Sequence, residues 1–168
     1  NKNRLIAVIS AILLRETPGA TIVTDSITST GLAQFIKAYG GKHHRFKRGY
    51  KKVINEAISL NQQGCYTPLA IETSGHAALK ENYFLDDGAY LAIRLLIEVA
   101  RLHQNNQGIS DLLSTLAEPE ESIEFRLPIR CDDFVSYGQR LIGRLTEYAE
   151  KDPAFSLAPN NYEGVRVQ

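Results

Sequence analysis

The five residues at positions 72–76 combine groups that could bind a polyhydroxylated ligand. They are a glutamate, a threonine, a serine, a glycine and a histidine, and they follow a short apolar run at residues 67–71. A carboxylate offers about four lone-pair sites, so Glu72 can accept hydrogen bonds from two neighbouring hydroxyl groups. The Ser74 hydroxyl can donate and accept, and Gly75 lets the backbone approach a ligand closely. Hydrogen bonds to a charged group are worth roughly 1.5–3 kcal/mol each, so a few of them can decide which sugar is bound.

The histidine of this segment and a more distant lysine are candidates for other tasks. We consider two roles for His76: a catalytic base or proton shuttle, and a side chain that only completes the hydrogen bonds of its loop. Lys47, in a basic turn, either attracts an anionic substrate or is a solvated surface lysine. Both alternatives stay open for each residue at this point. Arg45 and the other basic side chains around this turn are expected to be exposed to solvent.

No group of residues has the spacing of a metal site. His43 and His44 are adjacent on an expected strand, and no third ligand lies at metal-binding spacing from them. Asp86 and Asp87 precede a long apolar segment, where carboxylates suit the positive end of a helix. We therefore interpret this pair as helix N-caps rather than metal ligands.

Strands and helices alternate along the first hundred residues. Short β-branched or apolar runs predict strands, and apolar residues at i, i+3, i+4 and i+7 predict amphipathic helices. Residues 88–102 are apolar nearly all round the helix, so that helix is expected to be largely buried. The alternation predicts an α/β domain with a sheet layered between helices, three layers in all. Strands are expected at residues 20–24, 42–46 and 67–71, and helices at about residues 3–17, 32–39, 53–63 and 88–102.

Three polar loops follow the expected strands, at residues 25–29, 47–49 and 72–76. In sheets of this class, ligands bind outside the carboxyl ends of the strands. The segment with the richest chemistry therefore lies where the topology predicts a site, and we expect the other two loops to form its supporting wall.

The second part of the chain has a different pattern. Residues 103–108 read as a polar linker closed by glycine. The alternation at residues 122–129 predicts a strand, residues 134–150 a helix, and residues 154–157 and 162–168 two further strands. This β-α-β-β order predicts a partial α+β domain. We therefore expect two domains, at residues 1–102 and 103–168.

Composition excludes several classes of function. Nineteen Lys and Arg residues balance nineteen Asp and Glu residues, which gives no support for binding nucleic acid or a membrane surface. No apolar run approaches the roughly 20 residues needed to span a bilayer. Cys65 and Cys131 fit no metal or redox motif, so we interpret them as free thiols of a cytoplasmic protein. The sequence contains no Met, and we expect it to be a piece of a longer protein.

The segment at residues 72–76 resembles the sugar-binding loop of the α-D-phosphohexomutases, the phosphoglucomutase/phosphomannomutase family. That loop usually reads Gly-Glu-x-Ser-Gly-His, followed after a short gap by Asp-Asp-Gly and a long apolar helix. Here Ile71 stands in the place of the first Gly, and residues 86–88 supply the Asp-Asp-Gly. Residues 46–49 are similar to a Thr-Lys-x-Gly segment of the family's third domain, with Phe for Thr. Residues 163–167 resemble an Asp-Gly-x-x-x strand of its fourth domain, with Glu for Asp.

This resemblance implies a fold and an activity. Residues 1–102 look like the family's third domain, and residues 103–168 look like the opening of its fourth, a smaller α+β domain similar to the TATA-binding-protein fold. The family moves phosphate between O1 and O6 of a hexose through a bisphosphorylated intermediate. It uses a phosphoserine of the first domain and a Mg²⁺ held by an Asp-rich loop of the second, and neither loop occurs in this sequence.

The role implied for this piece is to bind the hydroxyls of a hexose phosphate while the remaining domains of the parent chain supply the phosphoserine and the Mg²⁺. Alone, the piece is expected to be catalytically inactive. Thr73 stands where aminosugar mutases tend to carry Gln, which favours glucose or mannose as the sugar. The implied substrate-binding residues are Glu72, Ser74, Gly75 and Lys47, with His76 as the catalytic candidate.

Two other functions are compatible with some of these features. A stand-alone α/β ligand-binding or regulatory module would need only the pocket at the sheet edge and no chemistry. A hydrolase using Ser74 and His76 is disfavoured, because residues two apart in a loop rarely form a nucleophile–base pair and the sequence has no Gly-x-Ser-x-Gly elbow.

Overall fold

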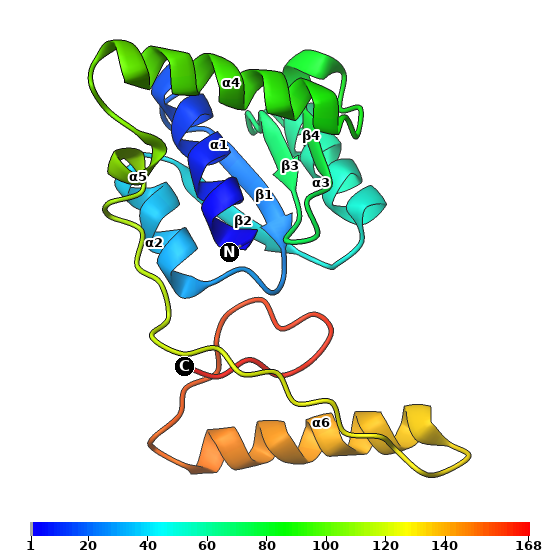
Figure 1. Ribbon diagram of the computed structural model, residues 1–168. Helices are drawn as coiled ribbons and strands as arrows, with labels where there is room; N and C mark the ends of the chain where they lie inside the picture. Colours follow the sequence, from blue (N-terminus) through cyan, green and yellow to red (C-terminus); the bar gives the residue numbers. More distant parts are fainter. Residues whose placement is uncertain (1) are drawn as a thin grey trace. The chain divides into compact units, whose positions relative to one another are not determined.

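The computed structural model describes residues 2–168, which divide into two compact units. The first unit ends at Pro119 and the second begins at Glu120. The first holds a four-stranded sheet with helices packed against it, and the second holds one long helix and extended segments (Figure 1).

The sheet of the first unit has the strand order β2-β1-β3-β4. β1 (Thr21–Asp25) pairs in parallel with β2 (Lys42–Phe46) on one side and with β3 (Leu69–Ile71) on the other. β4 (Ala77–Leu79) pairs antiparallel with β3, and the sequence analysis did not predict it. The expected strands and helices of this unit are otherwise confirmed. In chain order, the helices are α1 (Lys2–Glu16), α2 (Thr30–Ala38), α3 (Tyr50–Gln62), the 3-10 turn η1 (Lys80–Asn82), α4 (Gly88–Gln104) and α5 (Ile109–Leu112).

Successive side chains of the strands enter two different cores. Ile22 and Ile71 belong to the larger cluster, which also contains the buried faces of α1 and α2. Val23 and Ala70, each one position along, pack with Val53 of α3 on the opposite side of the sheet. Because neighbouring side chains on a strand point to opposite faces, the sheet lies between two layers of helices (Figure 1). The predicted α/β fold class with three layers is confirmed.

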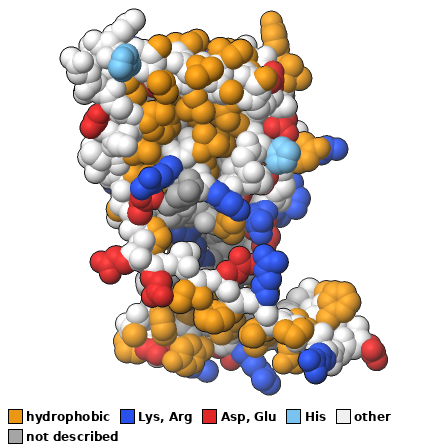
Figure 2. Space-filling model, viewed as in Figure 1, with side chains coloured by type: hydrophobic (Ala, Val, Ile, Leu, Met, Phe, Trp, Pro, Cys, Tyr) orange, Lys and Arg blue, Asp and Glu red, His pale blue; other side chains and the backbone are white. Residues whose placement is uncertain are grey.

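α4 is less buried than its sequence predicts. Asp87 caps it, as expected, by accepting hydrogen bonds from two backbone N–H groups of the first turn at 3.0 Å each. The buried positions of the helix are Leu91, Glu98 and Leu102. On the outer face, Leu96 is 67% exposed, and Figure 2 shows hydrophobic side chains along this part of the surface. The expectation of a largely buried helix is wrong, because the described residues of this unit cover one face of it.

The first unit extends beyond the boundary that the sequence analysis places after residue 102. Leu116 is buried in the larger core, and Ile109 and Leu113 pack against it. The hydroxyl of Tyr39 donates to the backbone oxygen of Leu112 at 3.0 Å. Residues 103–119 therefore pack on the α/β unit, because the short α5 presents an apolar side to that core.

The second unit contains part of the expected α+β pattern. α6 (Phe134–Lys151) is confirmed and is capped by Asp133. Leu157 and Val167 form an antiparallel bridge, so the two final expected strands meet over a short contact. Residues 122–129, expected to form a strand, are not assigned as one, because no partner strand among the described residues supplies its hydrogen bonds. None of the helices described between residues 2 and 168 is long and apolar enough to cross a membrane.

A buried carboxylate connects α4 to α1. The Glu98 side chain accepts hydrogen bonds from Arg15 at 2.9 and 2.7 Å and from Arg101 at 3.0 and 2.7 Å. Paired bonds of this kind between guanidinium and carboxylate groups are among the strongest in proteins. The bonds from Arg15, and then those from Arg101, lower the pKa of Glu98 to about 2, although burial acts in the opposite direction.

Replacing Glu98 with Gln is expected to reduce the free energy of unfolding of this chain by about 2 kcal/mol near pH 7. The pKa of Glu98 is lowered from 4.5 to about 2. Its stabilising contribution is therefore complete above pH 4.5 and is lost as the pH falls toward 2. Urea unfolding of both proteins at about pH 7 and about pH 3 measures the difference, which should shrink at the lower pH.

Glu81→Gln is the matched control, because the Glu81 side chain is 41% exposed and pairs with Arg94 at 3.2 Å. It should change the free energy of unfolding by less than about 1 kcal/mol. A loss for Glu98→Gln that is equal at both pH values would contradict the role given to the charge of Glu98.

Candidate functional site

Three loops meet at one edge of the sheet. β1 is paired in register with both neighbours, so that Asp25 lies opposite Phe46 and Thr24 lies opposite Ile71. The three parallel strands therefore end at the same level, and the loops that follow them at residues 26–29, 47–49 and 72–76 are neighbours. The sequence analysis placed the loops at residues 25–29, 47–49 and 72–76 together at this edge, and the strand pairing agrees, with Asp25 as the last residue of β1 rather than the first of its loop.

Residues 72–76 form the turn of the β3–β4 hairpin. The backbone nitrogen of Glu72 donates to the oxygen of His76 at 2.9 Å, and the nitrogen of Gly75 donates to the oxygen of Glu72 at 3.0 Å. Gly75 has a φ of +103°, a backbone conformation that side chains with a Cβ rarely adopt. The glycine is therefore required by the turn, and the turn places Glu72 and Ser74 on the same side of the loop.

Glu72 and Ser74 are linked directly. The residue Glu72 is 7% exposed, and Oε1 of its carboxylate accepts a hydrogen bond from the backbone nitrogen of Gly49 at 2.5 Å. Its Oε2 accepts from the hydroxyl of Ser74 at 3.1 Å. These two bonds fix the direction of the carboxylate and use part of its acceptor capacity, which leaves lone pairs for hydroxyl groups of a ligand.

Asp25 anchors the same turn and was not among the residues singled out from the sequence. Its Oδ2 accepts hydrogen bonds from the hydroxyl of Thr73 at 2.6 Å and from the backbone nitrogen of Thr73 at 3.3 Å. Burial raises the pKa of Asp25, and the two bonds from Thr73 oppose that rise. The available sequence signal was its position as the first carboxylate after the run of β-branched residues in β1.

His76 is held from two sides. Its Nδ1 lies 2.6 Å from Oδ2 of Asp86, and Oδ1 of Asp86 accepts from the backbone nitrogen of Ala77 at 3.2 Å. The ring of Tyr50, the first residue of α3, stacks on the imidazole with 5.0 Å between ring centroids. Asp86 is therefore a partner of His76 and not a helix cap, which corrects the expectation for that residue. With Nδ1 hydrogen-bonded to the carboxylate, Nε2 is the nitrogen available to exchange a proton.

The basic residues near the site divide into a surface group and a buried one. Lys47 is exposed, two positions before the Gly49 nitrogen that binds Glu72. Arg45 is 8% exposed, which contradicts the expected solvent exposure. Its guanidinium donates to the hydroxyl of Thr28 at 3.1 Å and to the backbone oxygen of Ser29 at 2.8 Å. Arg45 therefore connects β2 to the loop that follows β1.

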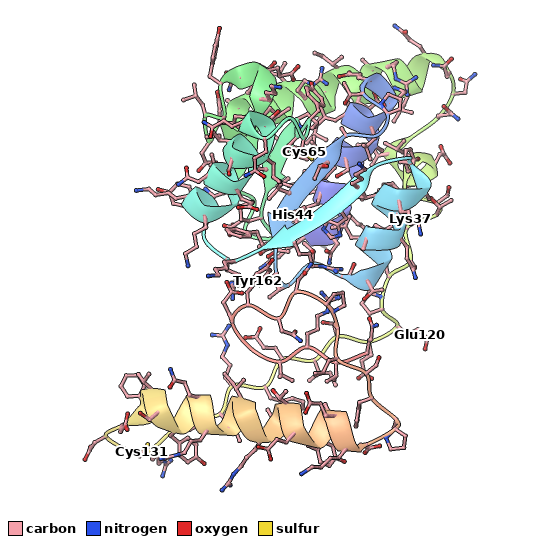
Figure 3. The ribbon with its side chains drawn as sticks, turned by 180° about the vertical axis from the view of Figure 1, so that it is seen from behind. Lys37, His44, Cys65, Glu120, Cys131 and Tyr162 are labelled. Carbon is pink, nitrogen blue, oxygen red and sulfur yellow. The ribbon has the colours of Figure 1, made fainter. Side chains whose placement is uncertain are left out.

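The two histidines of β2 have partners of other kinds. Nε2 of His43 lies 2.8 Å from the hydroxyl of Thr24, and Nε2 of His44 lies 2.9 Å from a carboxylate oxygen of Glu56 on α3. Figure 3 shows His44 on β2 and Cys65 in the segment that leads into β3. Within residues 2–168, no three side chains of His, Cys, Asp or Glu are grouped so as to hold a metal ion.

Comparison with known proteins gives consistent results. A family profile described as "Phosphoglucomutase/phosphomannomutase, alpha/beta/alpha domain III" matches residues 1–119. A phosphomannomutase/phosphoglucomutase of Pseudomonas syringae pv. tomato is 30% identical over 167 residues, covering 98% of this chain and 32% of the relative. A phosphoglucomutase of Neisseria gonorrhoeae is 28% identical over 167 residues, and the match spans 99% of this chain and 33% of the relative.

A solved structure shows the same relationship. The crystal structure of a phosphoglucomutase/phosphomannomutase family protein from Burkholderia thailandensis matches 99% of this chain and 32% of that protein, with a TM-score of 0.70 and 29% sequence identity. The chain thus spans about a third of the length of the relatives it matches. Because the family profile covers more than half of the sequence, the chain belongs to the α-D-phosphohexomutase family, and its first 119 residues are the α/β/α domain III of that family.

Proposed function

We propose that this chain is the sugar-reading segment of a phosphohexomutase that interconverts hexose 1-phosphate and hexose 6-phosphate, with glucose or mannose as the sugar. The observation that carries the proposal is the pairing of Glu72 with Ser74 at the carboxyl edge of the sheet. Glu72 is bound at each oxygen by one protein donor. A carboxylate oriented in this way can accept from two adjacent sugar hydroxyls.

Reading the hydroxyls suits a reaction that must accept the sugar in two orientations. In the proposed reaction, phosphate leaves one end of the hexose and enters at the other through a bisphosphorylated intermediate. The hydroxyls at O3 and O4 lie between these two ends, so the protein can bind the same two hydroxyls in both orientations of the sugar. These hydroxyls would be bound by Glu72, Ser74 and the backbone at Gly75. None of the three would take part in phosphoryl transfer.

His76 is the proposed proton-transfer group. Asp86 and the ring of Tyr50 orient its imidazole, and Nε2 is left to receive a proton from a sugar hydroxyl or to return one. A carboxylate that orients a histidine in this way also stabilises the charged ring that forms when the proton arrives. The exposed Lys47 is proposed to attract the phosphate group of the substrate.

Phosphoryl transfer itself is assigned to other domains of the parent protein. The phosphoserine and Mg²⁺ that the family uses belong to segments outside this chain, and Mg²⁺ there would stabilise negative charge on the transferring phosphate. We therefore propose that the 168-residue chain is inactive alone and acts within a longer cytoplasmic isomerase. Turnover of a hexose phosphate by this chain alone would contradict that division of labour.

Replacing Glu72 with Gln is expected to lower kcat/KM of the full-length enzyme for glucose 1-phosphate roughly 100-fold, because two hydrogen bonds from substrate hydroxyls to a charged acceptor weaken. Steady-state kinetics of the purified enzyme measure the change. Glu56→Gln, which removes a carboxylate of α3 that pairs with His44, should stay within about twofold of the original enzyme. If Glu72→Gln also stayed within that range, the assignment of residues 72–76 to sugar binding would be wrong.

Replacing His76 with Gln is expected to lower kcat about 100-fold or more while KM changes little, because general acid–base catalysis acts on the chemical step. The matched variant is Tyr50→Phe, which keeps the ring that stacks on the imidazole and should retain most of the activity. An unchanged kcat for His76→Gln would show that this histidine only completes the hydrogen bonds of its turn.

A further inference from the structure

The Asp25 carboxylate is buried at the site with one oxygen unused. Asp25 is 1% exposed at the end of β1. Its Oδ2 accepts both hydrogen bonds from Thr73, whereas its Oδ1 is buried and has no hydrogen-bond partner among the described residues. A buried polar group without a partner costs free energy, of the order of 1–3 kcal/mol. Such a group is retained most readily where it serves a site.

The electrostatic surroundings of Asp25 come from two neighbouring loops. Burial raises the pKa of Asp25, the bonds from Thr73 lower it, the nearby negative charge of Glu72 raises it and the positive charge of Arg48 lowers it. Two carboxylates, Asp25 and Glu72, are thus close enough to interact on neighbouring strands of the same sheet. Neutral side chains could cap this turn at lower cost, since they would avoid repulsion between like charges.

We propose that Asp25 is a positioning residue, which acts through Thr73 to hold the Glu72 carboxylate in the direction that receives the sugar hydroxyls. This inference rests on the proposed function, because it assigns a task to Glu72. Thr73 follows Glu72 directly in the chain, and Asp25 fixes both its backbone nitrogen and its hydroxyl. The peptide between the two residues is therefore tied to β1, a buried central element, rather than to a mobile loop.

The charge of Asp25 is part of this arrangement. An ionised Asp25 accepts two charge-assisted hydrogen bonds from Thr73 at Oδ2, whereas protonation removes the charge and weakens both bonds. Because burial raises the pKa of Asp25, this group takes up a proton at a higher pH than an ordinary aspartate. KM for the sugar is therefore expected to rise as the pH falls and Asp25 is protonated. Removing the Thr73 hydroxyl removes a bond that lowers the pKa of Asp25, so this rise in KM should then begin at a higher pH.

The test is a set of variants in the full-length enzyme, with glucose 1-phosphate as the substrate. Asp25→Asn is expected to raise KM about tenfold with kcat changed less than about threefold, because Glu72 grips the sugar in the ground state and in the transition state alike. Thr73→Val should raise KM to a similar extent, and Thr73→Ser, which keeps the hydroxyl donor, should remain close to the original enzyme. The acid limb of KM should be absent in Asp25→Asn and shifted to higher pH in Thr73→Val.

A double variant separates positioning from general stabilisation. If Asp25 acts through Glu72, the variant carrying Asp25→Asn and Glu72→Gln has the same kcat/KM as Glu72→Gln alone, within about twofold. If the fold-loss in kcat/KM of the double variant equalled the product of the two single losses, the inference would be overturned. An unchanged KM in both Asp25→Asn and Thr73→Val would overturn it too. If Glu72→Gln itself has no effect, the proposed function fails. If Glu72→Gln is impaired while Asp25→Asn and Thr73→Val are not, only the role of Asp25 fails.

Discussion

The parallel pairing of β1 with both β2 and β3 is the constraint on which the candidate site depends. It brings the end of each strand to one edge, so that Gly49 can bind Glu72, and Thr73 can bind Asp25, across long distances in sequence. The bond from the Gly49 nitrogen to Glu72 links the turn after β2 to the hairpin after β3. The bonds from Thr73 to Asp25 link that hairpin to the end of β1. A one-residue slip in either pairing would point these side chains into the wrong face of the sheet.

Much of the fold followed from local patterns, because strands and helices of the first unit have clear apolar periods and end signals. Residues 42–46 were placed without error and Asp87 was identified as a cap. β4 was missed because three residues, Ala77–Leu79, are too short to show alternation, and their strand character comes from pairing with β3. The strand expected at residues 122–129 fails for the converse reason, since its alternation is clear but no described strand pairs with it.

The site could be predicted only as far as residue type carries the information. A carboxylate, a hydroxyl, a glycine and an imidazole in one turn indicated ligand binding from the sequence alone. Which atoms they contact depends on residues that no local pattern connects. Asp86 reads as a cap beside Asp87 until the hairpin places His76 against it. Arg45 reads as a surface residue until the loop after β1 folds over its guanidinium.

Two buried carboxylates show how the same chemical group can be used in opposite ways. Glu98 has each oxygen bound by two guanidinium groups, and those bonds lower its pKa to about 2. Asp25 has one oxygen bound by Thr73 and the other without a hydrogen-bond partner among residues 2–168, and burial raises its pKa. The first arrangement stabilises the contact between α1 and α4. Holding a turn with the buried Asp25 carboxylate costs free energy. The proposed role explains this cost, because Asp25 would keep the Glu72 carboxylate in a defined direction. The difference in hydrogen-bond satisfaction is what distinguishes the carboxylate that joins two helices from the one for which we propose a role at the site.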